Sequence, residues 1–138
     1  MMILDTNVVS ALMKETPDAN VVSWLDRQPR TSIWISAITV FEVQMGIYIL
    51  EQGKRRSSLA QSFDLFLEKI GYRIATFDHA AAEEAASLSA ERRKTGRSVE
   101  LRDTMIAGVV LSQHAGLATR NVTHFSDVRT QVINPWTV

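Results

Sequence analysis

The sequence predicts an α/β fold in which a central parallel sheet is covered by helices on both faces, a three-layer α/β/α domain. Short apolar runs alternate along the chain with longer segments whose apolar residues recur at helical spacing. Such alternation is typical of parallel strands joined by right-handed helical crossovers. No internal repeat, low-complexity segment or linker interrupts the pattern, so we expect a single domain over residues 1–138.

Composition narrows the class of protein further. Hydrophobic residues make up 46% and charged residues 22% of the 138 residues, which is typical of a globular chain with a core. The absence of cysteine excludes disulfides and thiolate metal sites. A carboxylate at Asp5 and the lack of any long uncharged stretch argue against a secretory leader or a membrane span, so we expect a cytoplasmic protein.

Charge is balanced, with 15 basic and 15 acidic residues, so the chain as a whole does not attract a polyanion. Any nucleic acid would have to be held locally. Basic runs occur at residues 54–56 and 92–94, but short runs of this kind are usually solvated helix faces.

The first half of the chain predicts two strands and four helices. The apolar run 2–4 is the first strand, and Asp5 then provides a cap for a helix that continues to Met13. Pro17 and Asp18 are typical of the start of a second helix, which continues to Gln28. The later elements are a strand at 31–36, a helix at 37–51 that Ser36 can cap, and, after Gly53, a helix that ends at Gly71.

The helix at 37–51 is apolar on nearly all sides. A helix of this kind is either buried on most sides or placed in an oligomer interface. The second half of the chain predicts a strand at 72–77, a helix from Asp78 to about Gly96, a helix from about 101 that Gly116 closes, and strands at 117–119 and 131–133.

Polar residues that could carry chemistry are expected at one edge of this sheet. Asp5 follows the first strand directly and Asn121 follows the fourth, and ligands of parallel sheets bind at the carboxyl ends of strands. Glu42 lies in the middle of an apolar helix, where an unpaired carboxylate would be costly. Asp103 lies in the first turn of the sixth helix, on the same stripe as apolar residues.

Each of these residues also has an ordinary structural explanation. Asp5 can cap a helix, Asp103 can complement a helix dipole, and Asn121 can form a turn. Glu42 can be a half-exposed glutamate facing a basic neighbour. Taken together, however, several carboxylates at one sheet edge would repel one another without a cation. Oxygen ligands without cysteine or histidine favour Mg²⁺ or Mn²⁺, which would assist phosphodiester hydrolysis.

Four segments carry a resemblance to a known family. They are LDTN at residues 4–7, SAITVFEVQMG at 36–46, RDTMIAG at 102–108 and ATRNVTHF at 118–125. In this order they resemble the PIN-domain signature, and the ending NPW at 134–136 is similar to the VapC and FitB branch of that family. The resemblance covers nearly the whole chain.

The resemblance implies a Mg²⁺-dependent endoribonuclease, the dimeric toxin of a toxin–antitoxin pair. Its partner would be a small VapB-like antitoxin that itself binds operator DNA, so that this chain meets DNA only indirectly, in an assembly that can be larger than a dimer. Asp5, Glu42 and Asp103 match the metal-binding acids of the family. The residues that match or flank its supporting side chains are Thr6, Asn7 and Thr119. A fourth acid is common in the family where this chain has Asn121, which weakens the case for a tightly bound second ion.

Two other functions compete with the ribonuclease. A haloacid-dehalogenase-type phosphatase also begins with an aspartate after its first strand, but it needs an acid two residues later, where this chain has Asn7. A non-catalytic PIN-fold module, binding a partner within a DNA-bound toxin–antitoxin complex, is the alternative from another class. The three histidines are scattered without ligand spacing, so no catalytic role is expected for His79, His114 or His124.

Overall fold

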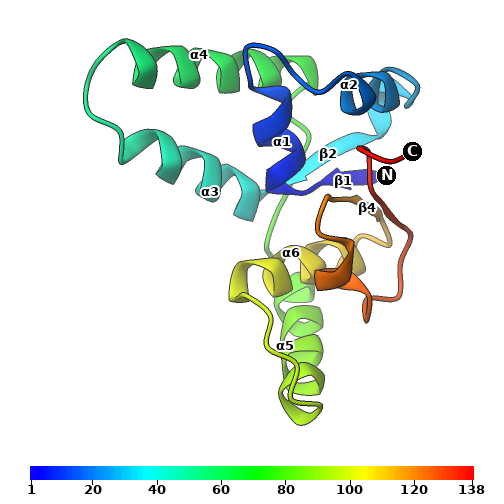
Figure 1. Cartoon of the computed structure of the whole chain (residues 1–138). Helices are drawn as coiled ribbons and strands as arrows, with labels where there is room; N and C mark the ends of the chain where they lie inside the picture. The colour runs from blue at the N-terminus through cyan, green and yellow to red at the C-terminus, as the bar shows by residue number, and fades with distance from the viewer.

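The computed structural model describes residues 1–138 and has a five-stranded sheet at its centre (Figure 1). All strand pairs are parallel, and the order is β3-β2-β1-β4-β5, with β1 in the middle. The predicted parallel sheet is therefore confirmed. The strands are β1 (Met2–Leu4), β2 (Ile33–Ser36), β3 (Ile74–Ala75), β4 (Gly116–Ala118) and β5 (Val132–Ile133).

Six α-helices and two 3₁₀ turns connect the strands. Four of the helices begin where the sequence predicts a cap, because the side chains of Asp5, Asp18, Ser36 and Asp78 accept backbone N–H groups of the following turn. The elements are α1 (Thr6–Leu12), α2 (Ala19–Asp26), η1 (Arg30–Ser32), α3 (Ala37–Tyr48), α4 (Lys54–Lys69), α5 (His79–Lys94), α6 (Leu101–Ser112) and η2 (Val122–Phe125).

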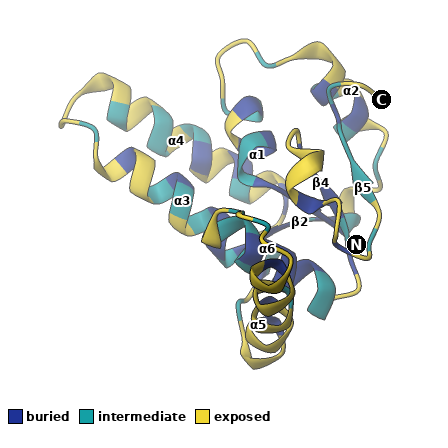
Figure 2. Ribbon diagram, turned by 60° about the horizontal axis from the view of Figure 1, so that its bottom comes forward, coloured by how far each residue is buried: buried dark blue, intermediate teal, exposed yellow.

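Alternating side chains of the short strands supply two separate cores. Met2 and Leu4 pack with α1, α2 and α4 on one face of the sheet, whereas Ile3 packs with α5 and α6 on the other. Figure 2 shows the buried residues concentrated around the sheet, with exposed residues along the outer sides of the helices. This arrangement confirms the three layers expected from the sequence.

Several predicted boundaries are wrong, among them the start of the strand expected at 31–36, whose first two residues belong to η1. The strand expected at 72–77 pairs only at Ile74–Ala75, because Gly71 and Tyr72 turn the chain through left-handed backbone with φ of 63° and 55°. The third helix ends at Tyr48, short of Glu51. The sixth helix ends at Ser112, and the chain reverses at His114, with φ of 51°, so that Gly116 already belongs to β4.

The helix α3 is not buried on most sides within the monomer. It forms a hairpin with α4 that extends beyond the sheet (Figure 1). Val43 and Ile47 face the core, but Phe41, Tyr48 and Ile49 are exposed. The excess apolar residues of this helix are therefore exposed in the monomer, and the predicted oligomer interface stays a prediction. No helix of the chain has both the length and the apolar character that crossing a membrane requires.

Candidate acidic site

Asp5 lies at the carboxyl end of the central strand and is almost completely buried, with 3% of its surface exposed. Its backbone N–H donates to the Ala118 carbonyl at 2.9 Å, which continues the ladder between β1 and β4. The Oδ1 atom accepts the Thr6 backbone N–H at 2.8 Å, and Oδ2 accepts the Thr119 hydroxyl at 2.7 Å. The carboxylate is thus held by two neighbouring strand ends.

The residues predicted to support the site do surround Asp5. The Asn7 amide donates to Asp5 Oδ2 at 3.2 Å and to Thr119 Oγ1 at 3.3 Å. Asn7 Oδ1 accepts the backbone N–H of Arg120 at 3.1 Å, so the segment after β4 is tied to the start of α1. The network fixes the position of the carboxylate before any ligand arrives.

Glu42 reaches the same sheet edge from α3. The Thr6 hydroxyl donates to Glu42 Oε1 at 2.7 Å and lies 3.0 Å from the Thr39 hydroxyl. The other carboxylate oxygen, Oε2, lies 3.6 Å from the Arg102 guanidinium. Glu42 therefore has a basic neighbour, as expected for a half-exposed glutamate without a catalytic role. Its Oε1 atom is instead bound by Thr6, the residue that follows Asp5.

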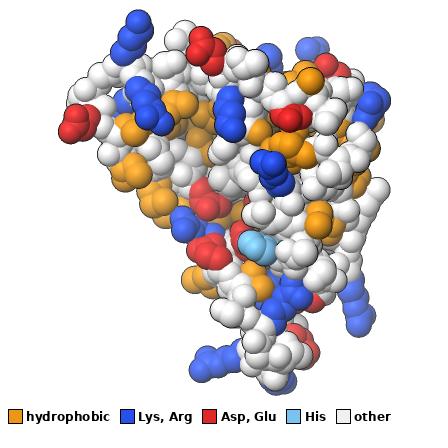
Figure 3. Space-filling model, viewed as in Figure 1, with side chains coloured by type: hydrophobic (Ala, Val, Ile, Leu, Met, Phe, Trp, Pro, Cys, Tyr) orange, Lys and Arg blue, Asp and Glu red, His pale blue; other side chains and the backbone are white.

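Asp103 is in the first turn of α6, as the sequence predicts, and its Oδ2 atom lies 2.9 Å from the Nδ1 atom of His124. His124 therefore lies beside a predicted site residue, although the sequence predicts no catalytic role for it. The contact depends on the 3₁₀ turn η2, which no helix or strand period in the sequence reveals. Figure 3 shows acidic side chains gathered beside a histidine on one face of the molecule.

Burial, with a smaller contribution from the negative charges of Asp103 and Glu42, raises the pKa of Asp5 to about 6. The hydrogen bonds from Thr119 and Thr6 act in the opposite direction but are outweighed. Glu42 and Asp103 therefore lie close enough to Asp5 for their negative charges to disfavour its ionised form. A cation at this place would relieve that repulsion.

The chemistry of the donor set fits a hard divalent cation, since the nearby side chains offer carboxylate oxygens and no sulfur. The arrangement is not a closed ligand cage, because no three aspartate, glutamate or histidine side chains converge on one point. Glu42 and Asp103 instead pair with Arg102 and His124. Both pairs involve partly exposed groups, and such pairs are weak and readily exchanged.

Asn121 lies at the beginning of η2, and its backbone N–H donates to the Thr119 hydroxyl at 3.0 Å. Its side chain is exposed and forms no hydrogen bond with Asp5, Glu42 or Asp103. The structure therefore brings Asn121 to the correct strand end without engaging its amide group.

A buried arginine connects η2 to the helices α5 and α6, and in the sequence it is visible only as part of a basic run. Arg92 on α5 is 3% exposed and donates from two nitrogens to Asp127, each at 2.9 Å. It also donates to the Thr104 hydroxyl at 2.7 Å and to the His124 carbonyl at 2.8 Å. One side chain thus fastens η2 to the residue next to Asp103.

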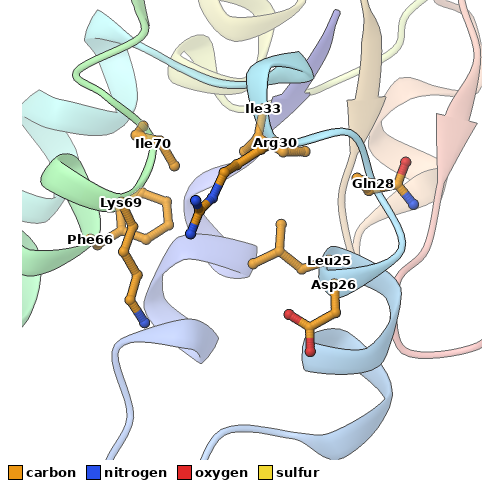
Figure 4. Close-up of a pocket in the computed structure, with 8 residues that line it drawn as sticks. All are labelled: Leu25, Asp26, Gln28, Arg30, Ile33, Phe66, Lys69 and Ile70. Carbon is orange, nitrogen blue, oxygen red and sulfur yellow. The ribbon is translucent and has the colours of Figure 1, made fainter.

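A hollow lies at the opposite edge of the sheet, where β2 begins (Figure 4). Its volume is about 480 Å³, and Ile33 and Phe66 form part of its apolar lining. Arg30 and Lys69 extend along its side. None of the predicted site residues lines this hollow.

Comparison with known proteins gives a consistent result. The PIN domain family matches residues 2–130. Over 99% of this chain, the plasmid stability protein StbB of Pseudomonas syringae is 36% identical and the VapC ribonuclease Y4jK of Sinorhizobium fredii is 34% identical, with 99% and 98% of those proteins covered. The toxin FitB of Neisseria gonorrhoeae is 31% identical over 99% of each chain.

Solved structures agree in fold. The crystal structure of FitAcB from Neisseria gonorrhoeae superposes with a TM-score of 0.90 at 31% identity, covering 100% of both chains. The structure of FitAB bound to an IR36 DNA fragment superposes with a TM-score of 0.89 at 31% identity, covering 100% of this chain and 97% of the other.

Proposed function

Because the chain belongs to the PIN-domain family, we propose that it is a metal-dependent endoribonuclease that acts as the toxin of a toxin–antitoxin pair. The observation that carries this proposal is the buried Asp5 carboxylate, whose charge is opposed by burial and by two further acids. An aspartate that only caps a helix needs no further acids beside it. A site that binds a cation and a phosphodiester does need several carboxylates close together.

In this proposal Asp5, Glu42 and Asp103 hold Mg²⁺ or Mn²⁺, and Asn121 offers a neutral carbonyl oxygen at the rim. The bound ion would stabilise the negative charge that develops on the phosphodiester during hydrolysis. Thr119 and Asn7 keep Asp5 oriented through the hydrogen bonds described above.

Thr6 has the corresponding role for Glu42, because its hydroxyl donates to the carboxylate. Unpaired or looped RNA is the substrate that a shallow site at a sheet edge can reach.

The proposed partner is a small antitoxin whose tail silences the site. The structure of FitAB bound to an IR36 DNA fragment, which this chain resembles over its whole length, is a protein–DNA complex. A basic side chain inserted among the three acids would neutralise them and exclude the ion. Arg102 already shows that a guanidinium is accommodated beside Glu42, at 3.6 Å. The toxin itself would meet operator DNA only through the antitoxin, in the cytoplasm.

One observation favours the non-catalytic alternative, a PIN-fold module that acts only within a DNA-bound complex. Glu42 and Asp103 are each paired with a side chain of the same protein, and no ready-made ligand cage is present. If these pairs persist when an ion is offered, the site would serve partner binding alone.

RNA cleavage by the purified chain, free of antitoxin, decides between the two. We expect cutting of single-stranded RNA with Mg²⁺ or Mn²⁺ and none with a chelator. Asp5→Asn, Glu42→Gln and Asp103→Asn should each lower the rate at least about a hundredfold. Asp64→Asn, an exposed acid on α4, is the matched control and should cut normally. Cleavage that persists in the chelator would contradict the metal mechanism, and an inactive wild type would favour the binding module.

A further inference from the structure

A groove lies beside the acidic site, between α1 and the C-terminal segment, and no role has been assigned to it so far. Its volume is about 590 Å³, and its lining includes Lys14, Arg120 and Trp136. Asn7, which supports Asp5, also lines the groove, so the two places share a wall. A ligand extending from the acids along this wall would enter the groove directly.

The Arg120 guanidinium is held in the groove without a carboxylate partner. Its carbon lies 4.9 Å from the centre of the Trp136 ring, a cation–π contact. None of the salt bridges of the chain includes Arg120, and its only polar contact is the backbone N–H donated to Asn7. Because stacking uses the face of the guanidinium, the N–H groups at its edge stay free to bind an anion.

Trp136 is itself fixed in place. Its backbone N–H donates to Asn134 Oδ1 at 2.9 Å, and its carbonyl accepts the Asn20 amide at 3.1 Å. The indole is half-buried and packs against the core on the α1 and α2 side of the sheet. Arg120 therefore rests on a rigid platform, which lowers the entropy that its long side chain loses when it binds a ligand.

The groove carries positive charge although the chain has no net charge. Lys14 is exposed on the same wall and, like Arg120, forms no salt bridge. The one acid in the lining, Asp18, is engaged by backbone N–H groups of Asn20 and Val21 at the start of α2. Two unpaired cations thus lie next to a site made of carboxylates.

We propose that this groove is a binding subsite for the phosphodiester backbone of single-stranded RNA, in which Lys14 and Arg120 bind phosphate and Trp136 is a positioning residue for Arg120. The inference rests on the proposed function and specifies where the substrate lies. Phosphate contacts from unpaired cations hold nucleic acid in place without reading its sequence. They would also offset the repulsion between RNA and the three acids.

A basic antitoxin tail is the other occupant to consider, and the charges disfavour it. The tail proposed above must carry a positive side chain to reach the acids, and two unpaired cations in the adjoining groove would repel it. An RNA strand has the opposite charge along its whole length. The groove is therefore better matched to substrate than to an inhibitor of that kind.

Binding can be measured apart from cleavage by working in the Asp5→Asn background. The probe is a short labelled single-stranded oligoribonucleotide of mixed sequence, followed by fluorescence anisotropy over a range of salt concentrations. We expect Arg120→Gln to weaken binding roughly tenfold. It should also reduce the slope of log Kd against log salt by roughly 0.7, since one phosphate contact is lost. Arg120→Lys keeps the charge and should keep the slope.

The role of Trp136 is tested by a double-mutant cycle. Trp136→Leu should weaken binding when Arg120 is present and have little further effect in Arg120→Gln, whereas Trp136→Phe should preserve most of the affinity. Arg30→Gln and Lys69→Gln, in the hollow at the opposite sheet edge, are the matched controls and should bind RNA normally. Thermal unfolding of each variant separates lost binding from lost folding.

The possible results separate this inference from the proposed function. If the wild type cuts RNA but Arg120→Gln and Lys14→Gln bind it normally, the subsite is overturned while the ribonuclease stands. If these variants lose affinity for the antitoxin and not for RNA, the groove is a protein-docking surface and the RNA assignment is overturned. If the protein neither binds nor cuts RNA, both proposals fall.

Discussion

At the scale of a single residue, the buried carboxylate of Asp5 lowers the free energy of unfolding at neutral and higher pH. Its folded pKa of about 6 lies above the ordinary aspartate value, so the folded state binds the proton more tightly than the unfolded chain does. The resulting stabilisation is fully present below pH ~4 and is lost as pH rises through 6. We expect metal-free Asp5→Asn to be more stable than the wild type at pH 8, by about 1–3 kcal/mol.

Urea unfolding at several pH values measures this difference, which should shrink as pH falls toward 4. An asparagine can still accept the Thr6 backbone N–H and donate to the Thr119 hydroxyl oxygen, but its NH2 group cannot accept the Asn7 amide as Asp5 Oδ2 does. Asp64→Asn is the control and should leave the pH profile unchanged. A less stable Asp5→Asn at pH 8 would mean that those hydrogen bonds already compensate the buried charge.

The positions of Asp5 and Asp103 are predictable for a simple physical reason. Asp5 follows a strand and Asp103 begins a helix, and both positions can be read from local patterns. The partners of these acids could not be read in the same way. His124 reaches Asp103 from a 3₁₀ turn, and Arg102 meets Glu42 on a different helix, so both contacts depend on how α3, α6 and η2 pack.

At the scale of elements, Arg92 links α5 and α6 to η2. Its hydrogen bond, together with its charge, holds the pKa of Asp127 below the usual range. The pair therefore stabilises the fold at pH values above the ordinary aspartate pKa, and this stabilisation is lost as pH falls through the lowered folded value. Asp127→Asn leaves a buried guanidinium without its counter-charge and should lower the free energy of unfolding by about 2 kcal/mol or more.

Chemical denaturation at neutral pH checks this expectation, and Arg93→Met on the same helix is the control. Arg93 is exposed and forms no salt bridge, so its removal should change stability little. RNA cleavage by Asp127→Asn should fall as well, because η2 also carries the His124 ring that contacts Asp103. Equal stability of Asp127→Asn and the wild type would show that the link is dispensable.

The elements themselves were predictable where a side chain marks a boundary. Asp18 and Asp78 fix helix starts because they accept N–H groups that the helix leaves free. Ends were harder, since α6 stops at Ser112 and the chain turns at His114 without a glycine. Residues 72–77 have strand-like composition, yet β3 is an edge strand with a single neighbour and pairs over only two residues.

At the scale of the whole molecule, the alternation of strands and helices predicts a parallel sheet but not its order. The position of β1 between β2 and β4 depends on how the whole chain packs, and it brings Asp5 between the ends of two neighbouring strands. The hairpin of α3 and α4 is also set at this scale. Because it extends past the sheet, Phe41, Met45, Tyr48 and Ile49 remain exposed, and hydrophobic side chains mark this part of the surface in Figure 3.

Exposed apolar side chains gathered on one helix are typical of an interface, so we expect the chain to form a homodimer through α3. A two-fold contact would use the same patch on both subunits. Ile49 is 77% exposed in the monomer, and Ile49→Lys should weaken the dimer at least about tenfold by placing a charge in an apolar contact. Light scattering over a range of micromolar concentrations measures the change.

The matched control for this interface is Leu101→Lys, an equally drastic change at an exposed leucine on α6. It should leave the dimer intact, because Leu101 lies outside the α3 patch. Thermal unfolding of Ile49→Lys under monomeric conditions should match that of the monomeric wild type, since the isoleucine contributes little to the monomer core. A wild type that stays monomeric at these concentrations would contradict the homodimer, and the apolar face of α3 would then have to be covered by the antitoxin instead.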